Sequence, residues 1–131
     1  MRQLEQARIL LAKAVEDEQA AAALLAHAGI ADSIIGFCCQ QAVEKLLKAL
    51  RSARLVVLRH THNLSALIDV LTQSGYAFPA DLRAVEGLTR FAVELRYDLF
   101  EEREQVDRQA VRTLIRRLRV LVESEIAKVA P

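Results

Sequence analysis

The stretch from Phe37 to Leu50, FCCQQAVEKLLKAL, decides the fold of this chain. Wound as an α-helix at about 100° per residue, it has two contrasting faces. One broad arc is apolar and comprises Cys38, Cys39, Ala42, Val43, Leu46, Leu47, Ala49 and Leu50. The opposite arc carries Gln40, Gln41, Glu44, Lys45 and Lys48, with Phe37 at its centre. The stretch predicts a helix that packs through one face and gathers polar groups on the other.

The composition is that of a helical protein with a single core. Hydrophobic residues make up 53% of the 131 residues, and there are only 2 Pro, 4 Gly and no Trp. A chain of this length can bury roughly two thirds of its unfolded surface, which is enough for one core. No alternating apolar and polar run is long enough to predict a strand. We therefore expect one domain, residues 1–131.

Charge, hydropathy and cysteine content narrow the class of protein. The formal net charge is +1, so the total charge does not favour a nucleic-acid or membrane surface. An acidic run (Asp98, Glu101, Glu102, Glu104) precedes Arg112, Arg116, Arg117 and Arg119, and we prefer to interpret both groups as solvated surface. No 18-residue apolar run or signal peptide is present. The adjacent Cys38 and Cys39 are expected to be free thiols, which indicates a cytoplasmic protein.

Five helices are predicted from apolar spacing and from start and stop signals. Their expected ranges are residues 2–27, 32–53, 62–74, 80–97 and 107–129. Asp32 or Ser33 is expected to cap the second helix, Thr61 the third and Asp107 the fifth. These helices predict an all-α fold, an antiparallel up-and-down four-helix bundle with an additional C-terminal helix. The surplus of apolar helix face predicts a homodimer.

The patterns give little support to metal binding or catalysis. No His-x-x-x-His or Glu-x-x-His spacing occurs, so we expect no metal and no cofactor. No Ser or Cys has a recognisable base partner, and there is no glycine-rich phosphate loop. We name no catalytic residue. Arg96 falls inside the apolar arc of the fourth helix and needs a partner, because an unpaired buried charge is very costly.

Three motifs, in this order, resemble the HEPN domain, named for nucleotide-binding domains of higher eukaryotes and prokaryotes. They are QQAVEKLLKA (residues 40–49), THNL (residues 61–64) and AVELRY (residues 92–97). The resemblance extends from Leu4 to Val122. It implies a helical bundle that is usually a homodimer, in a small prokaryotic protein paired with a minimal nucleotidyltransferase. Many such pairs are toxin–antitoxin modules in which the HEPN partner can be an RNase.

The nuclease branch of that family carries an arginine followed, after four to six residues, by a histidine. Here no histidine follows Arg96, because His62 is the last histidine of the chain. Arg54 and His60 have the bare spacing, but they lie at the end of the second helix, which the family does not use in this way. The chain resembles the branch that shares Gln-Gln, Glu-Lys, Thr-His and Arg-Tyr, which is inferred to bind a nucleotide or a nucleotidyltransferase.

The polar residues of the motifs allow two interpretations. In the structural one, Glu44 and Lys48 form an i,i+4 pair and Arg96 pairs with Glu44 or Glu94. The remaining polar groups of the second helix are then solvated. In the functional one, the second and fourth helices share a ligand-binding groove. Its candidate residues are Gln40, Gln41, Glu44, Lys45, Lys48, His62, Glu94, Arg96 and Tyr97. Lys and Arg would neutralise phosphate, and Tyr97 or Phe37 would stack on a sugar or base.

Three hypotheses of function follow. The first is a non-catalytic HEPN subunit that dimerises, pairs with a minimal nucleotidyltransferase, and binds a nucleotide or RNA. The second is a metal-independent endoribonuclease with a degenerate Arg-x4-6-His motif, in which Arg96 acts with a base that the sequence does not reveal. The third is a structural dimer whose polar groups only set the register of the helices.

Overall fold

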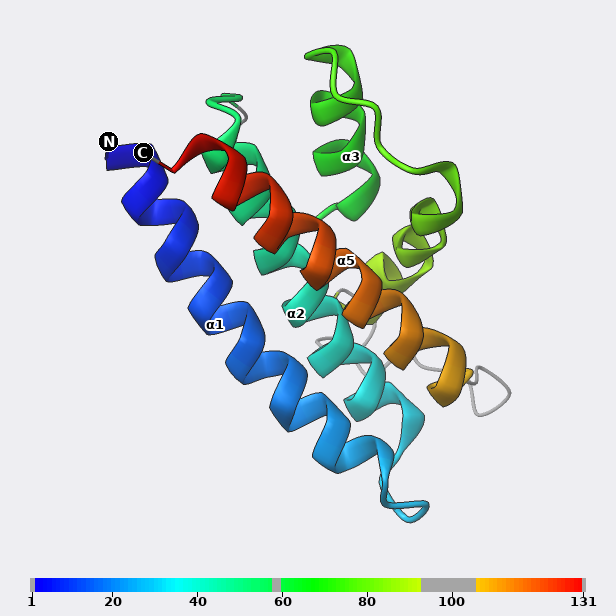
Figure 1. Ribbon diagram of the computed structural model, residues 1–131. Helices are drawn as coiled ribbons and strands as arrows, with labels where there is room; N and C mark the ends of the chain where they lie inside the picture. The colour runs from blue at the N-terminus through cyan, green and yellow to red at the C-terminus, as the bar shows by residue number, and fades with distance from the viewer. Residues whose placement is uncertain (1, 58–59, 93–105, 131) are drawn as a thin grey trace.

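The computed structural model describes residues 2–57, 60–92 and 106–130 (Figure 1). These residues form five helical elements and no strand, which confirms the predicted all-α helical bundle. The elements are α1 (Arg2–Leu25), α2 (Asp32–Ala53), α3 (Leu64–Gln73), the 3₁₀ helix η1 (Ala80–Leu88) and α5 (Arg108–Val129). In the described part of the chain, no helix is both long enough and apolar enough to cross a membrane.

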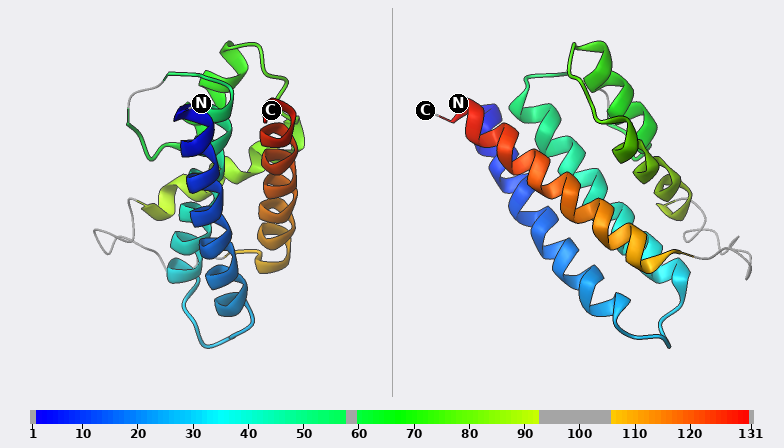
Figure 2. Two further views of the ribbon diagram at one scale, coloured as in Figure 1. Left: turned by 60° about the vertical axis from the view of Figure 1, so that its left-hand side comes forward. Right: turned by 45° about the vertical axis from the view of Figure 1, so that its right-hand side comes forward.

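The central element is α2, which contacts each of the other four described helices. α1 runs antiparallel to α2, and α5 lies beside both, while α3 and η1 pack on another side of α2 (Figure 2). Of the 22 residues of α2, 13 are buried. Because neighbours cover so much of this helix, the burial reaches past its apolar arc and includes Gln40 and Glu44. The structural interpretation expected Gln40 to be solvated, and for this residue it is wrong.

η1 replaces the first half of the α-helix that we predicted over residues 80–97. The buried residues of η1 are Leu82, Val85 and Leu88, and the next buried residue is Phe91. They are spaced by three residues. A 3₁₀ helix has three residues per turn, so this spacing places all of them on one stripe. Helical structure continues through residues 89–92, and the rest of the predicted helix, residues 93–97, lies outside the described residues.

The end of this segment is fastened to both α2 and α3. The backbone N–H of Leu64, the first residue of α3, donates to Thr89 Oγ1 at 3.1 Å. Two residues later, the buried ring of Phe91 lies directly against Gly36 of α2. A Cβ at position 36 would lie only 2.6 Å from Phe91 Cγ, so the close approach requires glycine. Ala92, the first residue of the third motif, follows Phe91 directly. It is therefore held close to Gly36, which lies one helical turn before Gln40 on α2.

Three predicted helix caps can be compared with the structure. Asp107 caps α5 as predicted, since its side chain accepts from the backbone N–H of Ala110. The cap of α3 is Asn63 rather than Thr61, because the Asn63 carboxamide reaches the N–H of Ala66 at 3.1 Å. The cap position of α2 is Ala31, and no side chain caps that helix. Asp32 and Ser33 are instead the first two residues of α2, so the prediction that one of them caps the helix was wrong.

Asp32, at the start of α2, binds Arg108, at the start of α5, and Arg108 also contacts the end of α1. Its carboxylate accepts from Arg108 Nε at 3.1 Å and Nη2 at 2.9 Å, and from the N–H of Val106 at 3.1 Å. The same guanidinium donates to the carbonyl oxygens of Leu25 (3.4 Å), His27 (2.9 Å) and Ile30 (2.7 Å). These carbonyls lie at and just after the end of α1, where backbone C=O groups have no N–H partner within the helix. Sequence reasoning did not single out Arg108, because nothing local marks its partners.

We predict that Gly36→Ala destabilises the protein. Alanine gains about 1 kcal/mol of helix propensity over glycine, but overpacking a filled core costs about 1–3 kcal/mol. The buried ring of Phe91 cannot move into solvent, so the cost should fall in the upper part of that range. After the gain in helix propensity, the free energy of unfolding should fall by about 1–2 kcal/mol. Chemical denaturation measures it, with Gly29→Ala as the control, since a Cβ at Gly29 meets no atom within 4 Å. A Gly36→Ala variant as stable as the natural protein would contradict this packing.

Candidate functional site

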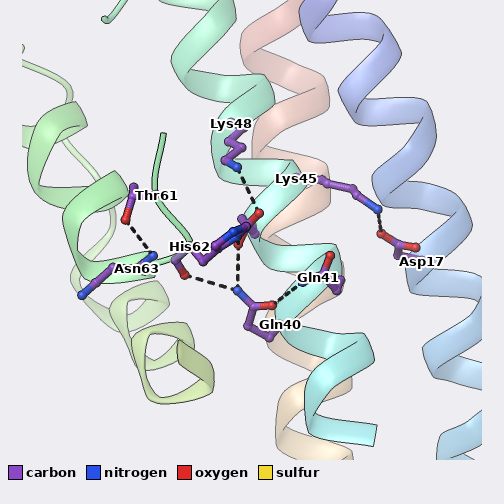
Figure 3. A network of polar contacts seen from close by, with 9 residues as sticks. Asp17, Gln40, Gln41, Lys45, Lys48, Thr61, His62 and Asn63 are labelled. Atoms are coloured by element: carbon purple, nitrogen blue, oxygen red, sulfur yellow. Dashed lines mark hydrogen bonds and ion pairs between the residues drawn. The ribbon is translucent and has the colours of Figure 1, made fainter. Parts of the chain in front are cut away.

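Glu44 is the centre of the polar groups on α2, and its partners Gln40, Lys48 and His62 are labelled in Figure 3. Its Oε1 accepts from Gln40 Nε2 at 3.0 Å and lies 2.9 Å from His62 Nδ1. Its Oε2 accepts from Lys48 Nζ at 3.0 Å. The residue is only 5% exposed, so these partners take the place of water. We call the group formed by Gln40, Gln41, Glu44, Lys48 and His62 the Glu44 cluster.

Local sequence explains part of the cluster. Gln40, Glu44 and Lys48 are spaced by four residues and therefore share one face of α2. The i,i+4 pair of Glu44 and Lys48, which the sequence predicted, is confirmed. Gln41 joins from the next position and donates to Gln40 Oε1 at 2.8 Å.

His62 reaches the cluster from the connection that precedes α3. Gln40 Nε2 donates to the His62 carbonyl oxygen at 3.3 Å, so the backbone as well as the ring of His62 is fixed on α2. A hydrogen bond within the THNL motif also fixes this connection, because the N–H of Asn63 donates to Thr61 Oγ1 at 3.0 Å. The motif therefore both starts α3 and delivers His62 to Glu44.

Hydrogen bonds keep Glu44 charged although it is buried. Burial by itself raises the pKa of this carboxyl. Hydrogen bonds from Gln40, Lys48 and His62, together with the charge of Lys48, outweigh that effect and leave the pKa below its ordinary value. Glu44 is thus an ionised acceptor at neutral pH.

An ionised Glu44 determines which nitrogen of the His62 ring carries the proton. A carboxylate can only accept, so Nδ1 is the nitrogen that donates and Nε2 is left as the acceptor in a neutral ring. Nε2 has no partner among the described residues, and half of the side chain (50%) is exposed. The edge of the His60 ring lies beside it, with the ring centroids 4.9 Å apart. His62 therefore offers one oriented nitrogen to a ligand or to a proton.

The structure brings together some of the predicted groove residues and separates another. Gln40, Gln41, Glu44, Lys48 and His62 form one cluster. Lys45 points away from it and pairs with Asp17 of α1, so its predicted place in the groove is wrong (Figure 3). Position 45 is one residue from Glu44, and on a helix this turns its side chain toward a different neighbour. Glu94, Arg96 and Tyr97, which complete the predicted set, lie outside the described residues.

Arg54 and His60 engage different neighbours. The Arg54 guanidinium lies over the Tyr76 ring at 4.6 Å, and its Nη1 is 3.9 Å from Glu125 Oε2 of α5. His60 instead contacts the ring of His62. Their five-residue separation in sequence therefore does not create a paired Arg–His site.

Neither thiol has the character of a nucleophile or metal ligand. Cys39 is buried, and burial raises its pKa to about 12. The partly exposed Cys38 is shifted in the same direction, again mainly by burial. Over residues 2–57, 60–92 and 106–130, His, Cys, Asp and Glu side chains form no group of three or more that could hold a metal ion.

We predict that Glu44→Gln lowers the free energy of unfolding by about 1–3 kcal/mol at pH 7, because a charged partner of Lys48 is lost. A carboxyl with a lowered pKa stabilises the fold above its ordinary pKa, and this is lost as the pH falls through the lowered value. The natural protein and the variant should therefore converge in acid. Urea denaturation from pH 7 to pH 3 tests this, with the exposed Glu16→Gln on α1 as control. Equal stability of natural protein and Glu44→Gln at pH 7 would exclude the stabilising role.

Comparison with known proteins gives one match. The model of the HEPN domain matches residues 7–128, nearly the whole chain. No curated protein and no solved structure matches significantly. The matched range includes all residues of the Glu44 cluster and both neighbouring motifs.

Proposed function

We propose that this chain, which belongs to the HEPN domain family, is a non-catalytic subunit that binds a nucleotide or RNA beside the Glu44 cluster. In the same proposal it forms a homodimer in the cytoplasm and pairs with a minimal nucleotidyltransferase, as in a prokaryotic toxin–antitoxin module. The family is one of nucleotide- and RNA-related function, and this supports the ligand class. The dimer, the partner and the module rest on the resemblance of the three motifs.

The single observation that carries the ligand proposal is the way His62 is presented. A histidine that only fixed a connection would need no exposed nitrogen, whereas here half of the side chain is exposed and Nε2 has no partner among the described residues. Lys48, with 16% of its side chain exposed, is the lysine of the cluster and binds the same carboxylate as His62. A hydrogen-bonding nitrogen beside an ammonium group suits a sugar hydroxyl or base edge next to a phosphate.

The proposed dimer has its own support. Six large aliphatic side chains are at least 47% exposed among the described residues, namely Ile9, Ile34, Leu55, Val57, Val120 and Val129. Val57, at 93%, and Leu55, at 69%, follow the end of α2. Exposed aliphatic groups favour association with another protein surface. Light scattering at micromolar concentration tests the dimer, and a monomer would contradict it.

We predict that His62→Ala weakens binding of a nucleotide or short RNA by about tenfold, the loss of roughly one good hydrogen bond. His60→Ala is the matched control, because its ring contacts His62 and forms no bond to Glu44. Calorimetry with a panel of mononucleotides and a short single-stranded RNA measures the affinities, and circular dichroism checks folding. No binding to the natural protein, or equal loss in the two variants, would refute the proposed site.

A nucleotidyltransferase partner is tested separately. We expect a neighbouring reading frame that encodes a Gly-Ser pair followed by paired aspartates, and we expect its product to co-purify with this chain. Absence of both would refute the pairing without affecting the ligand site.

A second candidate function is favoured by the orientation of His62. A histidine held by a carboxylate through Nδ1 is the arrangement of a general base. In a metal-independent RNase, Nε2 would take the proton of a ribose 2′-hydroxyl, whose oxygen attacks the adjacent phosphorus. The bond to the 5′-oxygen breaks, water protonates that oxygen, and a 2′,3′-cyclic phosphate remains. RNA cleavage in EDTA that is lost in His62→Ala, while the variant still folds, would establish this function instead of the first.

A further inference from the structure

A concave site lies between α1 and α5. The cavity has a volume of about 330 Å³ and shares no lining residue with the Glu44 cluster. Its apolar wall includes Val15, Ala22 and Leu25 of α1 and Ile115 of α5. The two helices lie side by side in both views of Figure 2. A volume near 300 Å³ is at the lower end of sites that hold small molecules.

Arginines of α5 line the same cavity, and they are not equivalent. Arg119 is fully engaged, with Nε on Glu18 Oε2 at 2.8 Å and Nη1 on Glu123 Oε1 at 2.7 Å. Glu18 and Glu123 are the two acids that line the cavity, so Arg119 provides a counter-charge for both. Arg112 and Arg116 are exposed and make no hydrogen bond or ion pair with any described residue. Two guanidinium groups, one helical turn apart, therefore remain available at the cavity.

This arrangement changes how the arginine run is interpreted. Spacing alone favoured a solvated surface, and Arg117 fits that expectation, since it pairs with Asp81 of η1 outside the cavity. Arg112 and Arg116 instead border a hollow whose wall is apolar. Guanidinium groups bind phosphate oxygens through paired N–H donors, and an apolar wall accepts a planar or hydrocarbon body. The combination selects a molecule that carries both features.

We propose that the cavity between α1 and α5 binds a small organic phosphate, with the phosphate between Arg112 and Arg116 and an apolar or planar body against the wall. The proposal is independent of the function assigned to the Glu44 cluster, because the two sites share no residue. A variant of either site therefore tests that site alone.

The test is an NMR titration of the full chain with phenyl phosphate, glucose 6-phosphate and inorganic phosphate at constant ionic strength. Phenyl phosphate should bind about tenfold more tightly than the other two, and amide shifts should centre on residues 15–25 and 112–119. The double substitution Arg112→Gln and Arg116→Gln should weaken it about tenfold or more. Ala22→Leu, which fills the cavity without changing charge, should also weaken it.

Arg117→Gln is the matched control for either single substitution, Arg112→Gln or Arg116→Gln, since it removes one charge from the same helix outside the cavity. Equal binding of inorganic phosphate, or an equal loss in Arg117→Gln, would reduce the effect to general surface charge and overturn the proposal. Equal binding of glucose 6-phosphate would overturn the apolar body, and unchanged binding in Ala22→Leu would overturn the cavity.

Discussion

A buried, ionised carboxylate is the constraint on which much of this structure depends. Glu44 lies on a helix that four other helices contact, and it keeps its charge only because three side chains donate to it or pair with it. Two of them, Gln40 and Lys48, come from α2 itself. The third, His62, belongs to the connection that begins α3. Satisfying one charge therefore also determines where α3 is attached, since an unpaired carboxylate at this depth would be very costly.

The segment after η1 is fixed by close packing on α2 and by a hydrogen bond to α3. Gly36 lets Phe91 lie directly on α2, and Thr89 receives the first N–H of α3. The segment after η1 is thus held by an apolar contact on one side and a hydrogen bond on the other. Gly36 is one helical turn before Gln40, and Leu64 is two residues after His62, so Ala92, the first residue of the third motif, is held near the other two motifs. The rest of the third motif lies outside the described residues.

The arginines of α5 show how tertiary neighbours divide one residue type among several tasks. Arg108 joins three helix ends through Asp32 and the carbonyls after α1, and Arg119 bridges two acids. Arg112 and Arg116 have no such partners in the part of the chain that the structure describes, and they border a cavity. All four lie within a short span of one helix with similar local sequence. A structural arginine differs from one available to a ligand only in the residues that face it, which come from α1, from the start of α2 and from α5 itself.

The sequence by itself determined the all-α class, the helical segments, the Asp107 cap and the pairing of Glu44 with Lys48, because periodicity, capping and i,i+4 spacing act over a few residues. Only the tertiary structure decided that Gln40 and Glu44 are buried, that Lys45 turns to Asp17, that residues 80–88 form a 3₁₀ helix and that His62 joins the cluster. The contacts of Glu44 and Lys45 depend on partners at least 18 residues away, namely His62 for Glu44 and Asp17 for Lys45. A helical wheel shows which side chains share a face, but burial of that face depends on which distant helices cover it.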